Sequence, residues 1–183
     1  MSMTTPDDEA LALERTVTDL INLCLAAKQA HWNVVGPRFG NLHPLFDALA
    51  DAASEGADRV AERFATLGCS PDGRVETAAA NNPLPVLHPG PLRDTTAVAF
   101  FGEILEIITT RLHESIDVAA SDLVTQGILL GVVERLEHLA WMVRAHDAGA
   151  PRGCHDRADR GGDGMADAHR PRAWAALGLS REM

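Results

Sequence analysis

Residues 41–67 read NLHPLFDALADAASEGADRVAERFATL. Apolar residues recur in this stretch every three or four positions, which is typical of an amphipathic α-helix. Four side chains of metal-binding type lie at mirror positions about a point between Ala52 and Ala53: His43, Asp47, Asp58 and Glu62. At ~100° per residue they fall within an arc of about 100°, so the sequence places all four on one face of the helix.

The spacing along the helix axis predicts a site that two chains share. Asp47 and Asp58 are separated by about 16 Å at ~1.5 Å per residue, so one helix cannot close around a single ion. Two antiparallel copies crossing at 52–53 would bring His43 opposite the partner's Glu62 and Asp47 opposite the partner's Asp58. A two-fold contact of this kind creates two identical sites. The crossing carries small residues that would allow a close approach: Ala52, Ala53, Ser54 and Gly56.

The types of side chain in this set indicate the metal. One imidazole with several carboxylates suits a redox-capable ion such as iron, and the absence of cysteine among these positions disfavours structural zinc. His31 precedes this helix and continues, at the same +4 step, the apolar stripe of the first helix: Leu13, Val17, Leu20, Cys24 and Ala27. Two simpler interpretations stay open: solvated polar residues on an amphipathic helix, and a core histidine at position 31.

The rest of the chain predicts an all-α protein. The first helix begins near Pro6 and ends before Gly36-Pro37, and two further helices are expected at 94–119 and 122–147. The two-residue join between these last helices makes them antiparallel neighbours. A connection over 69–93, rich in Pro, Gly and Asn, carries a short helical turn near Val75–Ala80. This pattern is typical of a ferritin-like four-helix bundle with a short helix in the long connection between helices two and three. We expect the bundle over 1–148 and a flexible tail, rich in Gly, Arg and Asp, over 149–183.

Composition limits the partners and the compartment. The chain has 183 residues, 46% hydrophobic and 4% aromatic, with a formal net charge of −10 at pH 7, which disfavours a duplex nucleic acid partner. The sequence shows no signal peptide and no apolar run long enough to span a membrane, so a cytoplasmic protein is expected, nucleoid-associated only if it binds DNA. Three scattered cysteines predict no disulfide framework, and Cys24 is expected to be a buried thiol.

Three segments together resemble the Dps family, the miniferritins of bacteria and archaea: KQAHWNVVG at 28–36, LHPLFD at 42–47 and DRVAER at 58–63. The segment EHLAWMVRA at 137–145 is similar to the family's last helix. The resemblance implies ferroxidase ligands at five positions, the first three from one subunit and the last two from its two-fold mate: His31, His43, Asp47, Asp58 and Glu62. It also implies that Trp32 lies beside the site and intercepts radicals, although a core aromatic is an equally good interpretation.

The resemblance further implies a ferroxidase that oxidises Fe(II) with hydrogen peroxide and stores ferric mineral, thereby protecting the cell from oxidative damage. Family members assemble as hollow homododecamers built from two-fold dimers, with a two-iron-type site between subunits. This sequence departs from the family in two places. It lacks a Lys-rich N-terminal extension, since its first basic residue is Arg15, and the family's Asp-x-x-Thr-x-Asp reads DLVTQG at 122–127. Asp117 and Asp122 are therefore interpreted either as part of an iron-access channel or as solvated helix-end charges.

Three other functions compete with this one. A DNA-binding, nucleoid-protecting protein would depend on the arginines of the C-terminal tail: Arg152, Arg157, Arg160, Arg170 and Arg172. Acidic residues between them weaken this alternative. A ferritin with its di-iron centre inside one bundle needs Glu-x-x-His on two helices, and the sequence contains no Glu-x-x-His. An inert scaffold is disfavoured by the complete set of ligand-type side chains.

Overall fold

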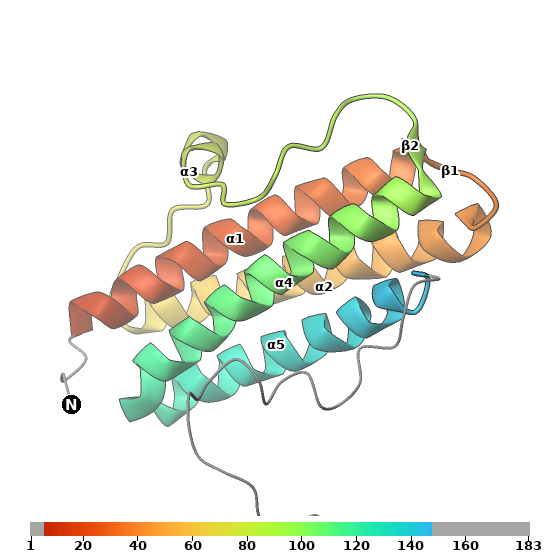
Figure 1. Ribbon diagram of the computed structural model, residues 1–183. Coiled ribbons are helices and arrows are strands. Elements are labelled where there is room, and N and C mark those ends of the chain that lie inside the picture. The colour runs from red at the N-terminus through yellow and green to blue at the C-terminus, as the bar shows by residue number, and fades with distance from the viewer. Residues whose placement is uncertain (1–5, 148–183) are drawn as a thin grey trace, which may run out of the picture. The chain divides into compact units, whose positions relative to one another are not determined.

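The computed structural model describes residues 6–147, and these form a bundle of four long helices (Figure 1). The elements follow in the order α1 (Pro6–Asn33), β1 (Val34–Val35), α2 (Phe39–Thr66), α3 (Val75–Ala80), β2 (Leu92–Arg93), α4 (Asp94–Val118), η1 (Ala119–Ser121) and α5 (Leu123–Arg144). The all-α class and the short helix in the long connection are therefore confirmed. The expected tail at 149–183, its arginines and the start of the chain lie outside the described residues.

The helix boundaries differ slightly from those expected. α2 begins at Phe39, two residues earlier than the sequence suggested, and includes Pro44 in its second turn. Its end follows the expected signal: Gly68 has a φ of 87° and donates its N–H to the carbonyl of Ala65 at 3.0 Å. α5 ends at Arg144, three residues sooner than expected. These differences leave the positions of the ligand-type residues on α2 unchanged.

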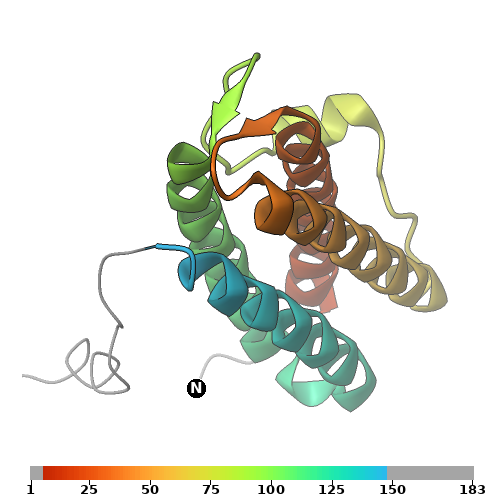
Figure 2. The ribbon, with the colours of Figure 1, turned by 90° about the vertical axis from the view of Figure 1, so that its right-hand side faces the viewer.

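The four helices form two antiparallel pairs. α1 and α2 are joined by the turn around β1, and α4 and α5 are joined by η1 (Figures 1 and 2). The connection from α2 to α4 runs back along α1, where the amide of Asn22 donates to the carbonyl of Ala78 in α3 at 2.8 Å. It ends in a parallel pairing of β2 with β1, Val34 opposite Leu92 and Val35 opposite Arg93. This two-residue pairing, which the sequence did not predict, attaches the start of α4 to the α1–α2 turn.

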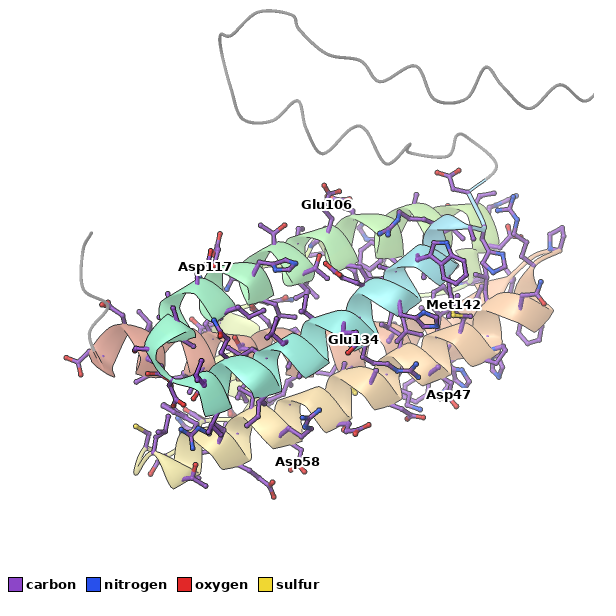
Figure 3. The ribbon with its side chains drawn as sticks, turned by 90° about the horizontal axis from the view of Figure 1, so that it is seen from below. Asp47, Asp58, Glu106, Asp117, Glu134 and Met142 are labelled. Carbon is purple, nitrogen blue, oxygen red and sulfur yellow. The ribbon has the colours of Figure 1, made fainter. Side chains whose placement is uncertain are left out.

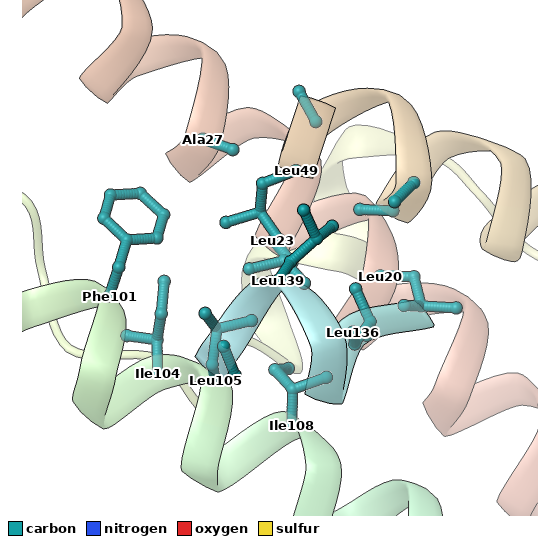
Figure 4. Packing of buried hydrophobic residues seen from close by; sticks show 14 of the residues in the cluster. Leu20, Leu23, Ala27, Leu49, Phe101, Ile104, Leu105, Ile108, Leu136 and Leu139 are labelled. Atoms are coloured by element: carbon teal, nitrogen blue, oxygen red, sulfur yellow. The ribbon is translucent and has the colours of Figure 1, made fainter. Parts of the chain in front are cut away.

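Leucine, isoleucine, valine, alanine and phenylalanine side chains fill the interior of the bundle. The rings of Phe46 and Phe101 lie 4.5 Å apart between α2 and α4, and both side chains are fully buried. Figure 4 shows leucine and isoleucine side chains from α1, α2, α4 and α5 meeting in the centre. A fully buried side chain of this size contributes about 1.5–3 kcal/mol relative to an exposed one, so this core holds the helices that carry the candidate site. Within residues 6–147, none of the helices has both the length and the apolar character that a membrane span requires.

Candidate metal centre

The turn between α1 and α2 brings two histidines face to face. His31 lies in the last turn of α1 and His43 in the second turn of α2, on either side of β1 and Gly36. Gly36 has a φ of 129°, a backbone conformation that residues with a Cβ rarely adopt, and this allows the chain to reverse within a few residues. The imidazole rings stack with centroids 3.7 Å apart and an angle of 24° between their planes.

Each histidine is held by the backbone of the other. The Nδ1 of His31 lies 2.8 Å from the carbonyl oxygen of His43, and the Nδ1 of His43 lies 2.8 Å from the carbonyl oxygen of His31. A carbonyl can only accept a hydrogen bond, so both Nδ1 atoms carry hydrogen. In a neutral imidazole this leaves the lone pair on Nε2, which is free to bind a metal ion. The two reciprocal bonds therefore fix one tautomer and one ring orientation for both histidines.

Asp47 lies beside this pair and forms an ion pair with Lys28. The Nζ of Lys28 contacts Oδ1 of Asp47 and lies 4.0 Å from the carboxylate of Asp51, while Nδ1 of His31 is 3.9 Å from the same Oδ1. The hydrogen bond from Lys28 lowers the pKa of Asp47, and the same bond raises the pKa of Lys28. Asp47 is therefore a carboxylate at neutral pH. The ammonium group of Lys28 lies beside it, where a metal cation would also be attracted.

Asp58 and Glu62 lie further along α2 and are exposed. Figure 3 shows Asp47 and Asp58 along the edge of α2 that faces away from α5. α2 is one continuous helix from Phe39 to Thr66, so the mirror spacing becomes a real separation of about 16 Å between the two aspartates. Among residues 6–147 of a single chain, no three His, Cys, Asp or Glu side chains converge as a metal site would require. In one chain His31 stacks on His43 and lies 3.9 Å from the carboxylate of Asp47, but the three do not converge on one point, and Asp58 and Glu62 lie apart from them.

Trp32, which follows His31, is 70% exposed. Its interpretation as a core aromatic was wrong, because position 32 falls on the outer side of α1 while the buried stripe passes through its neighbours. Phe39 is also largely exposed, and its ring lies 5.0 Å from that of His43. The histidine pair is therefore bordered by exposed aromatic side chains rather than enclosed by the bundle.

Of the four small residues expected at a crossing between two chains, Ala52, Ala53 and Gly56 are buried within their own bundle, and only Ser54 is exposed. Ala53 is fully buried, and Gly56 faces α5 and α1 inside its own bundle. A Cβ added at Gly56 would lie 3.2 Å from the side chain of Val132 and 3.4 Å from that of Leu20. The close approach that these residues permit is thus between helices of one chain. Any partner at this crossing would instead meet the exposed residues of α2, such as Ser54.

Cys24 is half-buried rather than fully enclosed, and burial raises the pKa of its thiol.

Asp117 is exposed near the end of α4 (Figure 3). Asp122 is a helix cap: it accepts hydrogen bonds from the N–H groups of Val124 at 3.0 Å and Thr125 at 3.2 Å, and it pairs with Arg63 at 2.5 Å. Its carboxylate is therefore occupied in joining α5 to α2, which gives it a structural role that the sequence had not assigned.

The Asp122→Ala variant is expected to lower the free energy of unfolding by about 1–2 kcal/mol at pH 7, because it removes the cap of α5. Hydrogen bonds from Thr125 and Arg63 lower the pKa of Asp122, so its stabilising contribution is complete above the ordinary carboxyl pKa and is lost as the pH falls through the lowered value. The difference between variant and parent should therefore shrink below about pH 4. Urea denaturation at two pH values measures it, with Asp117→Ala as the control.

Two residues that lie near the histidine pair were not predicted from the sequence. Lys28 is the single lysine of the chain and lies one helical turn before His31, a spacing that could have indicated a shared face. Asp94, by contrast, is distant in sequence. Its carboxylate is buried beneath the α1–α2 turn and accepts a hydrogen bond from the N–H of Arg38 at 3.1 Å. No local pattern indicates that contact, because it depends on the path of the long connection.

The arrangement has the chemistry of half of a metal site. It offers two imidazole nitrogens and one carboxylate beside the α1–α2 turn, from the end of α1 and the start of α2, and two further exposed carboxylates towards the other end of α2. Imidazole and carboxylate together suit iron, and none of the described cysteines lies at these positions.

Comparison with known proteins is consistent with this chemistry. The ferritin-like domain family matches residues 10–152. A DNA protection during starvation protein from Deinococcus radiodurans is 38% identical over 135 residues, which cover 73% of this chain and 56% of the relative. The chain thus spans little more than half the length of that relative. A protein of the same description from Mycolicibacterium smegmatis is 33% identical over 142 residues, covering 76% of each chain.

Solved structures of Dps proteins have the same fold as this chain. A crystal structure of a Dps protein from Deinococcus radiodurans superimposes with a TM-score of 0.74 at 37% identity, covering 78% of this chain and 87% of that one. An N-terminal deletion mutant of Dps from Mycobacterium smegmatis gives a TM-score of 0.74 at 32% identity, with 78% and 97% of the two chains covered.

Proposed function

The chain belongs to the Dps family of ferritin-like proteins and is a miniferritin; from this premise we propose that it is a ferroxidase and iron-storage protein. Its substrates are Fe(II) and hydrogen peroxide. The proposed site lies between two subunits, with His31, His43 and Asp47 from one chain and Asp58 and Glu62 from the other.

The histidine pair carries the proposal. Both rings are held by reciprocal hydrogen bonds to backbone carbonyls, which leave both Nε2 lone pairs available. A metal-binding histidine commonly donates its other ring N–H to a carbonyl or carboxylate, and this fixes the tautomer and orients the ligand. A pair of core histidines with no role in binding would need neither a common tautomer nor the neighbouring carboxylate of Asp47.

The ligand set also accounts for the direction of the chemistry. Carboxylates bind Fe(III) more strongly than Fe(II), so they make bound iron easier to oxidise. Hydrogen peroxide accepts two electrons, one from each of two Fe(II) ions, and with two protons it yields two Fe(III) ions and two water molecules. Pairing the two electrons avoids release of a hydroxyl radical. The exposed ring of Trp32, adjacent to His31, is proposed to intercept radicals that do form.

Lys28 gives the metal-free site its charge balance. Its ammonium group satisfies the carboxylate of Asp47, and Fe(II) must displace it to use that oxygen. The ion pair is partly exposed, with side-chain exposures of 35% and 42%, so the displacement costs little because water can solvate the released ammonium group.

Storage and assembly belong to the same proposal. The two-fold dimer that completes the site is proposed to build a hollow homododecamer, inside which Fe(III) hydrolyses and forms mineral. Binding of DNA through the C-terminal arginines is the remaining alternative. It rests on residues outside the described part of the chain and on the description of the relatives as DNA protection proteins.

Co-assembly of two inactive variants tests the shared site. One variant carries His31→Ala with His43→Ala, and the other carries Asp58→Ala with Glu62→Ala. In a mixed dimer, one site loses all four side chains and the other keeps the full set. Random mixing at equal amounts should therefore restore about a quarter of the parent's peroxide-dependent iron oxidation, from two individually inactive proteins.

The measurement is ferric absorbance after peroxide is added to Fe(II) under anaerobic conditions, corrected for the rate without protein. Differently tagged subunits allow the mixed assemblies to be isolated after co-expression. If the five residues act within one chain, the mixture stays as inactive as its two components. Each variant co-expressed with a differently tagged copy of itself and isolated in the same way controls for recovery during handling.

A further inference from the structure

Asp94, the first residue of α4, lies against the turn that joins the two histidines. We infer that Asp94 is a positioning residue for the His31–His43 pair: it holds the turn in the conformation that aims both imidazoles. This inference rests on the proposed function, because it assigns to Asp94 the support of the backbone that orients two of the proposed metal ligands.

The contacts of Asp94 reach the start of α2. Its side chain is almost fully buried, with 7% of the residue exposed. Oδ2 accepts a hydrogen bond from the N–H of Arg38 at 3.1 Å, and Oδ1 accepts one from the N–H of Thr95 at 2.8 Å. Arg38 is the residue that caps α2, five positions before His43. The two oxygens therefore link the first turn of α4 to the first turn of α2.

Gly36 and Asp94 occupy complementary space. A Cβ added at Gly36 would lie 2.7–2.9 Å from the three atoms of the Asp94 carboxyl group, closer than real Cβ atoms come. The carboxylate thus fills the volume that any side chain at position 36 would need. Together with the pairing of Val34 with Leu92, it fixes the turn from two sides.

The α1–α2 turn sets the orientation of both imidazole rings. Each histidine bonds the backbone carbonyl of the other, so the two rings keep their orientation only while the backbone at 31 and at 43 keeps its spacing. A shift of the first turn of α2 would lengthen both bonds at once. The N–H of Arg38, held by Asp94, lies in the segment whose position sets that spacing.

The alternative is that Asp94 stabilises the fold without any influence on the ligands. A buried carboxylate that accepts two backbone hydrogen bonds contributes to stability in any protein, so a fall in Tm cannot distinguish the two roles. Metal affinity and the spectrum of the bound metal can, because they report the orientation of the imidazoles.

The test is Asp94→Asn in the full-length assembled protein, with Co(II) as a probe that does not turn over. Asparagine keeps the volume of the side chain but replaces one acceptor oxygen with an NH₂ donor, so one of the two backbone bonds is lost. Loss of a direct hydrogen-bond partner of a metal ligand typically weakens metal binding by about 10–100-fold, and Asp94 acts one step further out through the backbone of Arg38, so the lower end of that range, about 10-fold, applies. We expect a loss of that size for Co(II), together with altered intensity of its visible absorption bands.

Two further variants make the outcome decisive. Glu103→Gln changes an exposed carboxylate of the same helix, to which no role in metal binding is assigned, and it should bind Co(II) as the parent does. Gly36→Ala strains the turn directly through its φ of 129° and through its contact with the Asp94 carboxyl group, so it supplies the reference spectrum of a displaced turn, which Asp94→Asn should resemble. An Asp94→Asn protein with lowered Tm but parental Co(II) affinity and spectrum would overturn the positioning role alone. A parent protein that binds no Co(II) would overturn the proposed function and this inference with it.

Discussion

The His31→Ala, His43→Ala double variant is expected to lose protein-dependent iron oxidation by about 100-fold or more. Removal of an outer partner of a metal ligand already costs about 10–100-fold, and this variant removes two ligands outright. The helices should remain folded, because the pair contributes two side-chain-to-backbone hydrogen bonds of about 1 kcal/mol each, while the core beneath it is untouched.

Stopped-flow absorbance of the ferric product measures the rate, and a spin trap measures hydroxyl radical released from peroxide. The variant should release more radical than the parent, because Fe(II) then reacts in solution rather than in pairs. His88→Ala, an exposed histidine in the long connection, serves as the control and should behave as the parent does. Equal rates in the double variant and the parent, with the assembly intact, would remove the site from consideration.

The second large effect concerns the ion pair between α1 and α4. Arg111→Met is expected to lower the free energy of unfolding by about 3 kcal/mol at pH 7, since it leaves the carboxylate of Asp19 buried without its partner. In the parent, Nε of Arg111 lies 2.6 Å from Oδ2 of Asp19 and Nη2 lies 3.2 Å from Oδ1, and the aspartate side chain is only 4% exposed.

The loss should depend on pH in a defined direction. Burial raises the pKa of Asp19 above its ordinary value, against the lowering effect of Arg111, so removal of the arginine raises it further. A raised carboxyl pKa favours the folded state at low pH and opposes it as the pH rises, so the variant should be closest to the parent in acid and furthest from it at neutral pH.

Chemical denaturation at pH 5 and pH 7, at one subunit concentration, gives both values. Glu114→Gln is the matched control, because it breaks a partly exposed pair with Arg15 at 3.2 Å, in which the Glu114 side chain is 56% exposed, and should cost less than about 1 kcal/mol. An Arg111→Met protein as stable as the parent at neutral pH would show that Asp19 finds another partner.

Much of this architecture was predictable because the signals are local. The apolar stripes, the capping residues and Gly68 specify α1, α2, α4 and α5 to within a few residues, and the short helix at 75–80 was predicted at its observed position. The outer face of α2 was predictable for the same reason, since a helix fixes which side chains share a face. The subunit contact on that face stays a prediction, because it involves a second chain.

The remaining features depend on contacts between distant parts of the chain. The surroundings of Gly56 depend on the position of α5. The sequence suggested that this small residue allows a contact between two chains, but in the structure it lies against Val132 of the same chain. The burial of Asp94 and the pairing of β1 with β2 depend on the return path of the connection. Lys28 was the exception, because its position one turn before His31 was visible in the sequence and was not used.

The long connection is fastened at both ends, by Asn22 to α3 at one end and by β2 to β1 at the other. Between these attachments Leu84 is buried in the core and Leu87 packs against it, so the exposed residues 88–91 form a short loop with fixed end points. Each doubling of the length of such a flexible loop costs only about 0.6 kcal/mol of closure entropy. Insertions at 88–91 are thus expected to be nearly neutral for the helices, and this exposed stretch is the part of the backbone where added length can accumulate without altering the histidine turn.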